Sequence, residues 1–162
     1  MGYYVDIDNE LKQAKATFLR YSLIFSTALT ITLIADTLLI VFSKENYTLN
    51  FIFASLITIL FSWYAIFFFS SIYRDVNGKY RYYKNYESGV KEDAEVKFIA
   101  RRGELTYVNG LYVYPLKVKY VYGLTEEEKI IYTLSEDLDF KEGDKLTIST
   151  YQRIIMKAEK HS

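Results

Sequence analysis

Hydrophobic residues are concentrated in two stretches in the first half of the chain, residues 21–42 and 51–72. The first stretch contains one charged residue, Asp36, and the second contains none. Each has 22 residues, which in a helix reach about 33 Å and can cross a hydrocarbon core of about 30 Å. A soluble helix of this length usually carries a charged stripe. The pattern therefore predicts two transmembrane spans, joined as a hairpin by the polar connector at residues 43–50.

Basic residues near the span ends favour one orientation of this hairpin. The connector contains a single basic residue, Lys44, whereas the outer flanks contain seven: Lys12, Lys15, Arg20, Arg74, Lys79, Arg81 and Lys84. Because cytoplasmic flanks carry the excess of lysine and arginine, both termini are expected in the cytoplasm. A cleavable signal peptide is disfavoured, because the first stretch is too long and a second follows it directly. We expect an integral membrane protein.

Small and hydroxyl-bearing residues recur at helical spacing along both spans. They form one face on each helix: Ser22, Ser26, Thr30 and Thr37 in the first span, and Ser55, Thr58, Ser62 and Ala65 in the second. Such faces allow helix backbones to approach closely in lipid. The preferred interpretation is that they pack the two spans on each other. The alternative is that they pack on a partner's helices or on a second copy.

Asp36 is the one carboxylate within the apolar stretches. An ionised carboxylate at mid-span costs about 2.5–3.5 kcal/mol, so such a group is usually satisfied or functional. Asp36 lies six residues from the outer end of its span. We expect it to be bonded to neighbouring threonine hydroxyls or protonated, with binding of a partner or an ion as the alternative. The spans contain no second charged group that could complete a proton relay.

The segments on either side of the spans combine charged and apolar residues. Residues 1–20 read as an amphipathic lead-in helix with Asp8 as its N-cap. Residues 74–89 form a linker in which basic residues alternate with tyrosines. This pattern suits anionic lipid headgroups or single-stranded nucleic acid, and the position directly after a span favours lipid. The predicted headgroup ligands are Arg74, Lys79, Arg81 and Lys84.

From residue 90 onwards the hydrophobic period changes to two, which is typical of half-buried strands. Asn109-Gly110 is a strong hairpin signal, because a type I′ turn needs positive φ at both positions. Pro115 suggests an edge or a bulge, and residues 123–128 read as a polar loop. Six strands are expected, at residues 94–101, 105–108, 111–122, 129–134, 145–151 and 153–158. The predicted class is an α+β membrane protein: a two-helix transmembrane hairpin followed by a small antiparallel β barrel or sandwich at residues 90–160.

Three predicted strand segments, residues 114–123, 130–133 and 143–151, are similar to the strands of a known family. With their Tyr-Pro strand and Gly-Asp strand, they resemble a bacterial family of membrane-anchored β domains of unknown function, over residues 94–151 at most. The chain departs from that pattern at Gln152-Arg153 and in the acidic loop at 124–128. A weaker similarity is to NfeD-like membrane proteins with an oligonucleotide-binding-type barrel. Either resemblance implies a prokaryotic scaffold or assembly role.

Composition argues against several kinds of chemistry. The chain has no cysteine, and its one histidine, His161, lies beside the C-terminus, so zinc-thiolate sites and histidine-based triads are disfavoured. The acidic run at 136–144 fails the EF-hand spacing, because positions six and twelve are Glu142 and Ile148. Phosphate-binding and nucleophile-elbow motifs are absent from the sequence. We expect no metal, no cofactor and no enzymatic activity.

Three functions are compatible with this pattern. The preferred one is a non-enzymatic interaction or scaffold protein that presents a small cytoplasmic β domain from the membrane. The alternatives are a subunit of an oligomeric transport or channel assembly and a membrane immunity-type protein. Anionic membrane lipids and either a second copy or a membrane-protein partner are the expected contacts. With 20 basic and 20 acidic residues the chain has no net charge, so a nucleic-acid partner is not expected.

Overall fold

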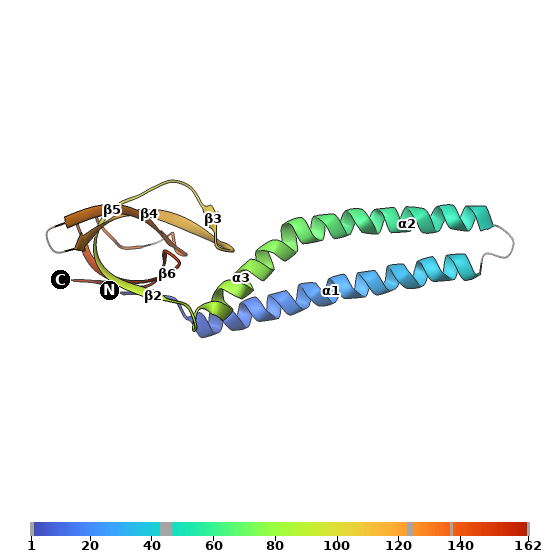
Figure 1. Cartoon of the computed structure of the whole chain (residues 1–162), viewed down its shortest axis with the longest axis horizontal. Coiled ribbons are helices and arrows are strands. Elements are labelled where there is room, and N and C mark those ends of the chain that lie inside the picture. Colours follow the sequence, from blue (N-terminus) through green and yellow to red (C-terminus); the bar gives the residue numbers. More distant parts are fainter. Residues whose placement is uncertain (1, 43–46, 123–124, 137, 162) are drawn as a thin grey trace. The chain divides into compact units, whose positions relative to one another are not determined.

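The structure is a computed structural model that describes residues 2–42, 47–122, 125–136 and 138–161. The chain divides into two compact units. One is the helical unit Gln13–Asn77, and the other combines Met1–Lys12 with Gly78–Ser162. The second unit contains every strand of the protein that the described residues form. Figure 1 shows the elements of both units.

Two long helical runs account for the apolar stretches. Helix α1 is Ile7–Val41, and α2 is Tyr47–Phe67. Helix α2 continues through the π-helical segment η1, Phe68–Tyr73, into α3, Arg74–Asn85. Both runs are long and apolar enough to span a membrane, judged by length and composition alone. Of the predicted connector, residues 43–46 lie outside the described part, and residues 47–50 belong to α2.

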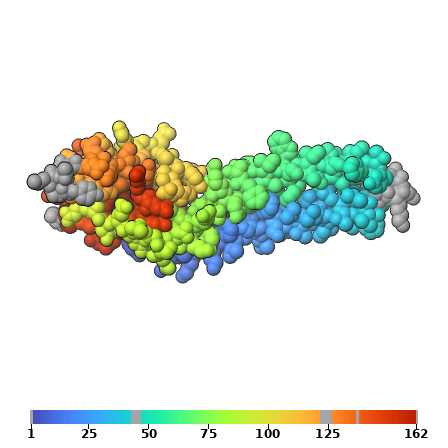
Figure 2. Space-filling view, in the orientation of Figure 1, coloured from blue at the N-terminus to red at the C-terminus, as the bar shows by residue number. Residues whose placement is uncertain are grey.

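Helices α1 and α2 lie side by side and pack through aromatic rings and alanines (Figure 2). The ring of Phe25 in α1 lies 5.8 Å from that of Phe61 and 4.7 Å from that of Phe68. Phe68 and Ala54 are buried. The remaining surface of the pair is hydrophobic and exposed, with Trp63 at 72%. Its other large exposed residues include Leu23, Leu60, Ile66 and Phe67.

The lead-in at residues 1–20 differs from the prediction at its start. Residues Gly2–Tyr4 form strand β1, and α1 begins only at Ile7. The backbone N–H of Asn9 donates to Asp6 Oδ1 at 3.1 Å, and the N–H of Glu10 donates to the Asp6 carbonyl. Asp6 is therefore the N-cap. The prediction of Asp8 as the cap was wrong, because the strand pairing of residues 2–4 sets where the helix starts.

The strands form a mixed sheet that closes into a near-barrel ring. In order they are β2 (Lys91–Arg101), β3 (Thr106–Val108), β4 (Leu111–Tyr122), β5 (Thr125–Thr133), β6 (Lys145–Tyr151) and β7 (Ile154–Lys160). The sheet runs β1-β7-β5-β4-β2-β6, and an additional β6–β7 pairing closes the ring. The contact between β5 and β7 is parallel and consists of the single pair Tyr132↔Ile154. Strand β3 pairs with β4, so the described residues form a sheet of seven strands rather than six, and one of its pairings is parallel.

The core of the ring follows the predicted alternation of inward and outward positions. Its buried members include Val96, Phe98, Leu116, Val118 and Ile131. The alternation fails after Phe98, because a bulge between Phe98 and Ala100 shifts the pairing with β4. Ala100, which the pattern placed inside, is exposed. The predicted polar loop at 123–128 is also shorter, because β5 begins at Thr125, and residues 123–124 lie outside the described part.

Two turn predictions can be compared with the structure. Asn109 has φ 52° and Gly110 has φ 90°, and Val108 pairs with Leu111. This confirms the predicted hairpin. Pro115 lies within β4 rather than on an edge strand, but β2 ends opposite it, and the N–H of Arg102 donates to the Pro115 carbonyl at 2.9 Å. In an antiparallel sheet the backbone N and O of one residue point toward the same neighbouring strand. The nitrogen of Pro115, which has no hydrogen to donate, therefore points toward the end of β2, where the ladder of hydrogen bonds stops.

The N-cap assignment predicts a difference between two neighbouring aspartates. Asp6→Ala should destabilise the first turn of α1 by about 1 kcal/mol, because the Asn9 N–H loses its acceptor. Hydrogen exchange of the amides of residues 8–11, measured on the full chain in detergent, should accelerate by about fivefold. Asp8→Ala is the matched control and should change the same amides less. The opposite ranking of the two variants would contradict the assignment.

Candidate functional site

Asp36 makes the polar contact that joins the two helices of the hairpin. The hydroxyl of Thr58 in α2 donates to Asp36 Oδ2 in α1 at 2.8 Å. The predicted threonine partner is therefore on the facing helix, 22 positions along the chain. In surroundings this apolar, a single side-chain hydrogen bond between helices fixes their axial register, because sliding would leave both groups unsatisfied.

The second oxygen of the Asp36 carboxylate, Oδ1, does not share in this hydrogen bond. Asp36 Oδ1 is buried and has no hydrogen-bond partner among the described residues. An unsatisfied buried carboxylate oxygen is costly. Asp36 therefore joins the two helices through Oδ2 alone.

The predicted hydroxyl faces are only partly at the contact between the helices. Ser22, Ser55 and Ala65 are half-buried. The other predicted packing residues are exposed: Ser26, Thr30, Thr37, Thr58 and Ser62. The hydroxyls of Thr30, Thr37 and Ser62 donate to carbonyls four residues earlier in their own helices. Of these five exposed residues, Thr58 contacts the facing helix through Asp36, whereas Thr30, Thr37 and Ser62 bond within their own helices.

A shallow groove runs along the exposed face of α1. It has a volume of about 280 Å³ and is lined by Thr30, Leu33, Ile34, Thr37 and Leu38. Two of these residues, Thr30 and Thr37, belong to the predicted face of small and hydroxyl-bearing residues. Contact of this face with a partner's helix or with a second copy of the chain, the alternative interpretation, stays a prediction.

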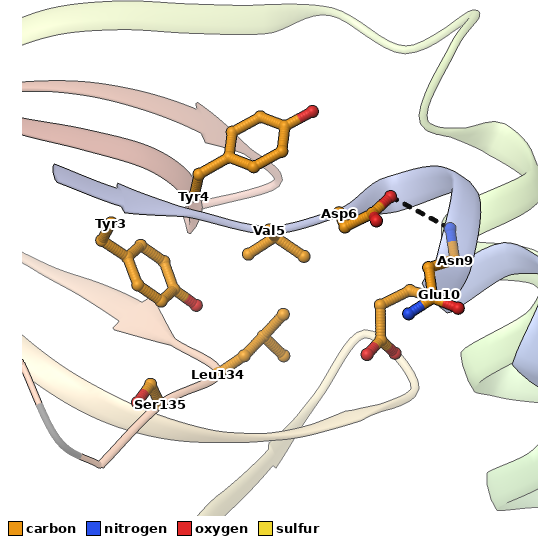
Figure 3. A pocket seen from close by; sticks show the side chains of 8 residues that line it. All are labelled: Tyr3, Tyr4, Val5, Asp6, Asn9, Glu10, Leu134 and Ser135. Carbon is orange, nitrogen blue, oxygen red and sulfur yellow. Dashed lines mark hydrogen bonds between the residues drawn. The ribbon is translucent and has the colours of Figure 1, made fainter.

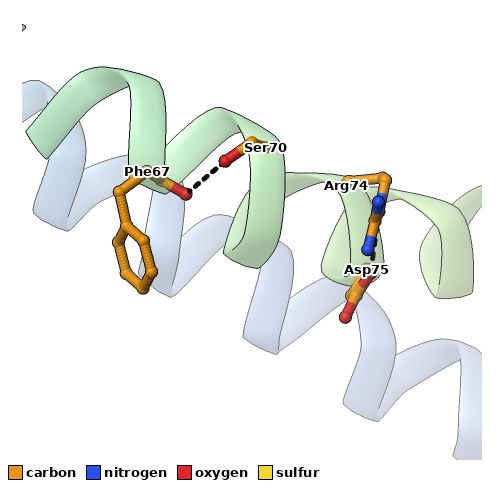
Figure 4. Close-up of polar contacts among 4 residues, drawn as sticks. All are labelled: Phe67, Ser70, Arg74 and Asp75. Atoms are coloured by element: carbon orange, nitrogen blue, oxygen red, sulfur yellow. Dashed lines mark hydrogen bonds and ion pairs between the residues drawn. The ribbon is translucent and has the colours of Figure 1, made fainter. Parts of the chain in front are cut away.

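The predicted headgroup residues have partners in the structure. Arg74 Nε lies 3.2 Å from Asp75 Oδ1, and nearby the Ser70 hydroxyl donates to the Phe67 carbonyl (Figure 4). Lys79 Nζ lies 2.8 Å from Glu10 Oε2. Lys84 lies over the ring of Tyr80. Arg81 is exposed on α3. Exposed ion pairs contribute little to stability, so these pairings can be exchanged for lipid phosphates at small cost.

Helix α3, like strand β1, was not predicted from the sequence. It occupies the predicted linker and buries Tyr82 and Tyr83. The Tyr82 hydroxyl donates to the Tyr151 carbonyl at 2.9 Å, and the Tyr151 hydroxyl donates to the Asn85 carbonyl. A Cβ added to Gly89 would fall within the ring of Tyr151. The tyrosines of this segment are thus packing residues that attach α3 to β6. The signal for this was the adjacent pair Tyr82-Tyr83 at helical spacing from Tyr86.

Burial changes the acidity of these tyrosines. Desolvation raises the pKa of Tyr82, and the neighbouring tyrosine hydroxyls add to the rise. Desolvation also raises the pKa of Tyr83, with the carboxylate of Glu10 as the second cause. Glu10 accepts a hydrogen bond from Tyr83 and pairs with Lys79. Both phenols therefore remain neutral hydrogen-bond donors at physiological pH.

A polar cavity of about 230 Å³ lies beside β1 and the start of α1 (Figure 3). Tyr3, Leu134 and Ser135 lie on one side, and Asp6, Asn9 and Glu10 on the other. Asp6 caps the helix and Glu10 is paired with Lys79. The Tyr3 hydroxyl is bonded to Thr133 and to the backbone of Leu134, and burial raises its pKa. Asp6, Glu10 and the Tyr3 hydroxyl thus all bond within the chain, next to β1.

A second cavity of about 330 Å³ lies where β2 and β5 end, beside residues 114–116 of β4. Its polar lining residues also bond within the chain. The Arg101 guanidinium donates to the Leu138 carbonyl at 2.5 Å, and the Tyr114 hydroxyl donates to Glu136 at 3.2 Å. These bonds tie the segment after β5 to the barrel.

Several surface carboxylates of the β domain pair with lysines, among them Glu128 with Lys117 and Asp144 with Lys160. A hydrogen bond from Lys117 lowers the pKa of Glu128, and one from Lys160 lowers that of Asp144. Asp144 also accepts the backbone N–H of Lys141, so it closes a turn. Within the described residues, no group of three or more carboxylates or histidines is arranged to hold a metal ion. His161 is exposed and contacts the Thr147 hydroxyl. Asp137, part of the acidic run, lies outside the described residues.

Comparisons with known proteins gave no match. No protein-family model, curated protein or solved structure matched the chain.

The clamp between the helices predicts a measurable coupling. In a double-mutant cycle of Asp36→Leu and Thr58→Val, the coupling free energy should be about 0.6 kcal/mol and at most about 1.7 kcal/mol, as for other hydrogen bonds between membrane helices. Unfolding of the full chain by sodium dodecyl sulfate in micelles, followed by Trp63 fluorescence, measures it. Thr30→Val is the control, because its hydroxyl bonds within its own helix. Zero coupling for the Asp36 and Thr58 pair would contradict the clamp.

The buried tyrosines predict a loss of stability in alkali. The unfolded chain releases their protons at about pH 10, whereas the folded chain retains them. The unfolded state then binds fewer protons, so the free energy of unfolding decreases as pH rises above about 10 and is unaffected below it. Calorimetric unfolding of the full chain in detergent between neutral and alkaline pH measures the slope. Tyr82→Phe should make the decrease shallower, and an unchanged slope would count against this assignment.

Proposed function

We propose that this protein is a non-enzymatic membrane-anchored interaction protein, in which the helical hairpin inserts into a bacterial membrane and presents the β domain on the cytoplasmic side. The observation that carries the proposal is the surface of the hairpin. Leu23, Leu60, Trp63 and Ile66 are each more than two-thirds exposed. An apolar surface of this kind marks a membrane or interaction site, because water does not tolerate it.

The polar groups of the hairpin fit the same surroundings. Helix hydroxyls are bonded to carbonyls of their own helix, as in Thr30, Thr37 and Ser55. Asp36 is bonded across the hairpin to Thr58. Polar groups within hydrocarbon need internal partners of this type. The basic excess outside the spans supports the orientation with both termini in the cytoplasm.

The β domain supports a binding role rather than a reaction. Its strand order resembles a five-stranded, partly open barrel to which β1 and β3 have been added. This arrangement supports the similarity to oligonucleotide-binding-type barrels on membrane anchors. The charges on its surface are balanced and paired, as in the pair of Lys117 with Glu128. Partners are therefore expected to be proteins or lipids rather than nucleic acid.

The exposed stripe on α1 provides a surface for association within the membrane. The groove at Thr30, Leu33 and Thr37 is available once the hairpin has formed. Small and hydroxyl-bearing residues allow helices to approach closely in lipid. A homo-oligomer or a complex with another membrane protein is the expected form. Co-purification of two differently tagged copies from mixed membranes tests self-association.

Topology is the decisive experiment for the proposal. The chain lacks cysteine, so Thr48→Cys and His161→Cys each introduce a single reporter. We expect the protein to remain in membranes after alkaline carbonate washing. A membrane-impermeant maleimide should label Thr48→Cys in intact cells and His161→Cys only after permeabilisation.

Two outcomes would contradict the proposal. Release of the chain by carbonate would show that the hairpin does not insert. Labelling of His161→Cys alone in intact cells would place the β domain outside the cytoplasm. Labelling of both variants after permeabilisation is the control that each cysteine is reactive.

A further inference from the structure

The β3–β4 hairpin has two unlike faces. Leu111 and Val113 point inward and are 4% and 0% exposed. Tyr107 and Tyr112 pair across the strands on the other face, with ring centroids 5.0 Å apart. They are 37% and 52% exposed, and Leu105, just before β3, is 50% exposed. The outward face of a surface hairpin is usually polar, so this tyrosine patch (Leu105, Tyr107 and Tyr112) requires an explanation.

The tip of this hairpin touches helix α3. A Cβ added to Gly78 would lie 2.8 Å from Gly110 Cα, and one added to Gly110 would lie 2.5 Å from the carbonyl carbon of Gly78. The Tyr107 hydroxyl lies 3.0 Å from the first of these positions. Two glycines therefore allow the backbones of the hairpin tip and of α3 to meet, and they hold Tyr107 beside that helix.

Gly78 lies in the first half of α3, the helix that follows the second apolar stretch. Helix α3 begins at Arg74, directly after the apolar stretch 51–72, and it carries Lys79, Arg81 and Lys84. If that stretch spans a membrane, the first turns of α3 lie at the headgroup layer, where lysine and arginine attract anionic lipids. Whatever packs on those turns is held near the same layer.

We propose that the tyrosine patch is a second membrane contact, which inserts between the headgroups of an anionic lipid surface beside the cations of α3. The inference rests on the proposed function, because it requires an inserted hairpin. Tyrosine suits this role, because its ring is apolar and its hydroxyl is polar. Anchoring at both α3 and the hairpin would limit the orientations that the β domain can adopt at the membrane.

Tryptophan quenching tests the two ideas separately. The native chain has one tryptophan, Trp63, which reports on the apolar stretch itself. In a Trp63→Phe background, Tyr112→Trp and Leu105→Trp report on the patch, and Val90→Trp is the matched control. Val90 is 83% exposed and follows the opposite end of α3 from Gly78. The full chain is reconstituted in phosphatidylcholine and phosphatidylglycerol vesicles that carry a spin label either on the headgroup or at mid-chain.

The expected result is loss of emission from Trp63 with the mid-chain label, and from Tyr112→Trp and Leu105→Trp with the headgroup label. Val90→Trp should keep its emission with both labels. Omission of phosphatidylglycerol should weaken the quenching at the patch but not at Trp63.

Three outcomes would overturn the proposal. If Trp63 is quenched but the patch reporters behave like Val90→Trp, the hairpin is inserted and the patch is not in lipid. A blue-shifted but unquenched Tyr112→Trp would mean that protein covers the patch. An unquenched Trp63 would refute both the membrane anchor and the second contact. Agreement between Tyr112→Trp and Leu105→Trp guards against an effect of one substitution on folding.

Discussion

One uninterrupted helical run, from Tyr47 to Asn85, has to satisfy two different environments, and the rest of the architecture depends on it. Its first part exposes leucine, isoleucine and tryptophan side chains along the hairpin. Its last part buries Tyr82 and Tyr83 within the β domain.

The change of character falls at the π-helical segment Phe68–Tyr73. An extra residue in a helical turn rotates all later side chains about the axis, so a π-helical segment can redirect a helix face without breaking the helix. The faces that pack on α1 and on β6 can therefore differ.

The extent to which the sequence predicted this structure depends on the range of the interactions involved. The two apolar helices were clear, because they need only composition and length. The Asn109-Gly110 turn was equally clear, because it depends on the φ angles of two adjacent residues. Most strands also followed from alternation.

The errors have a common physical origin in contacts between distant segments. Strand β1 exists because residues 2–4 pair with residues 157–159, and this pairing moves the helix cap from Asp8 to Asp6. The exposed side of Ala100 results from a bulge set by β4. From the sequence alone, Tyr82 and Tyr83 resemble residues of a membrane interface. In the structure, the Tyr82 hydroxyl donates to the Tyr151 carbonyl of a distant strand. Likewise, the period of the serines and threonines identified a helix face but not its neighbour.

The pairing of β1 with β7 also has a consequence for how the chain is made. Strand β7 contacts β1, β5 and β6, so it joins segments that lie more than 150 residues apart in the chain. The ring cannot close until residues 154–160 have left the ribosome. The two apolar helices leave the ribosome earlier, so they can form before their β domain does. A chain that stalls before β7 would therefore carry complete helices and an open sheet with unpaired edges, which can pair with other chains.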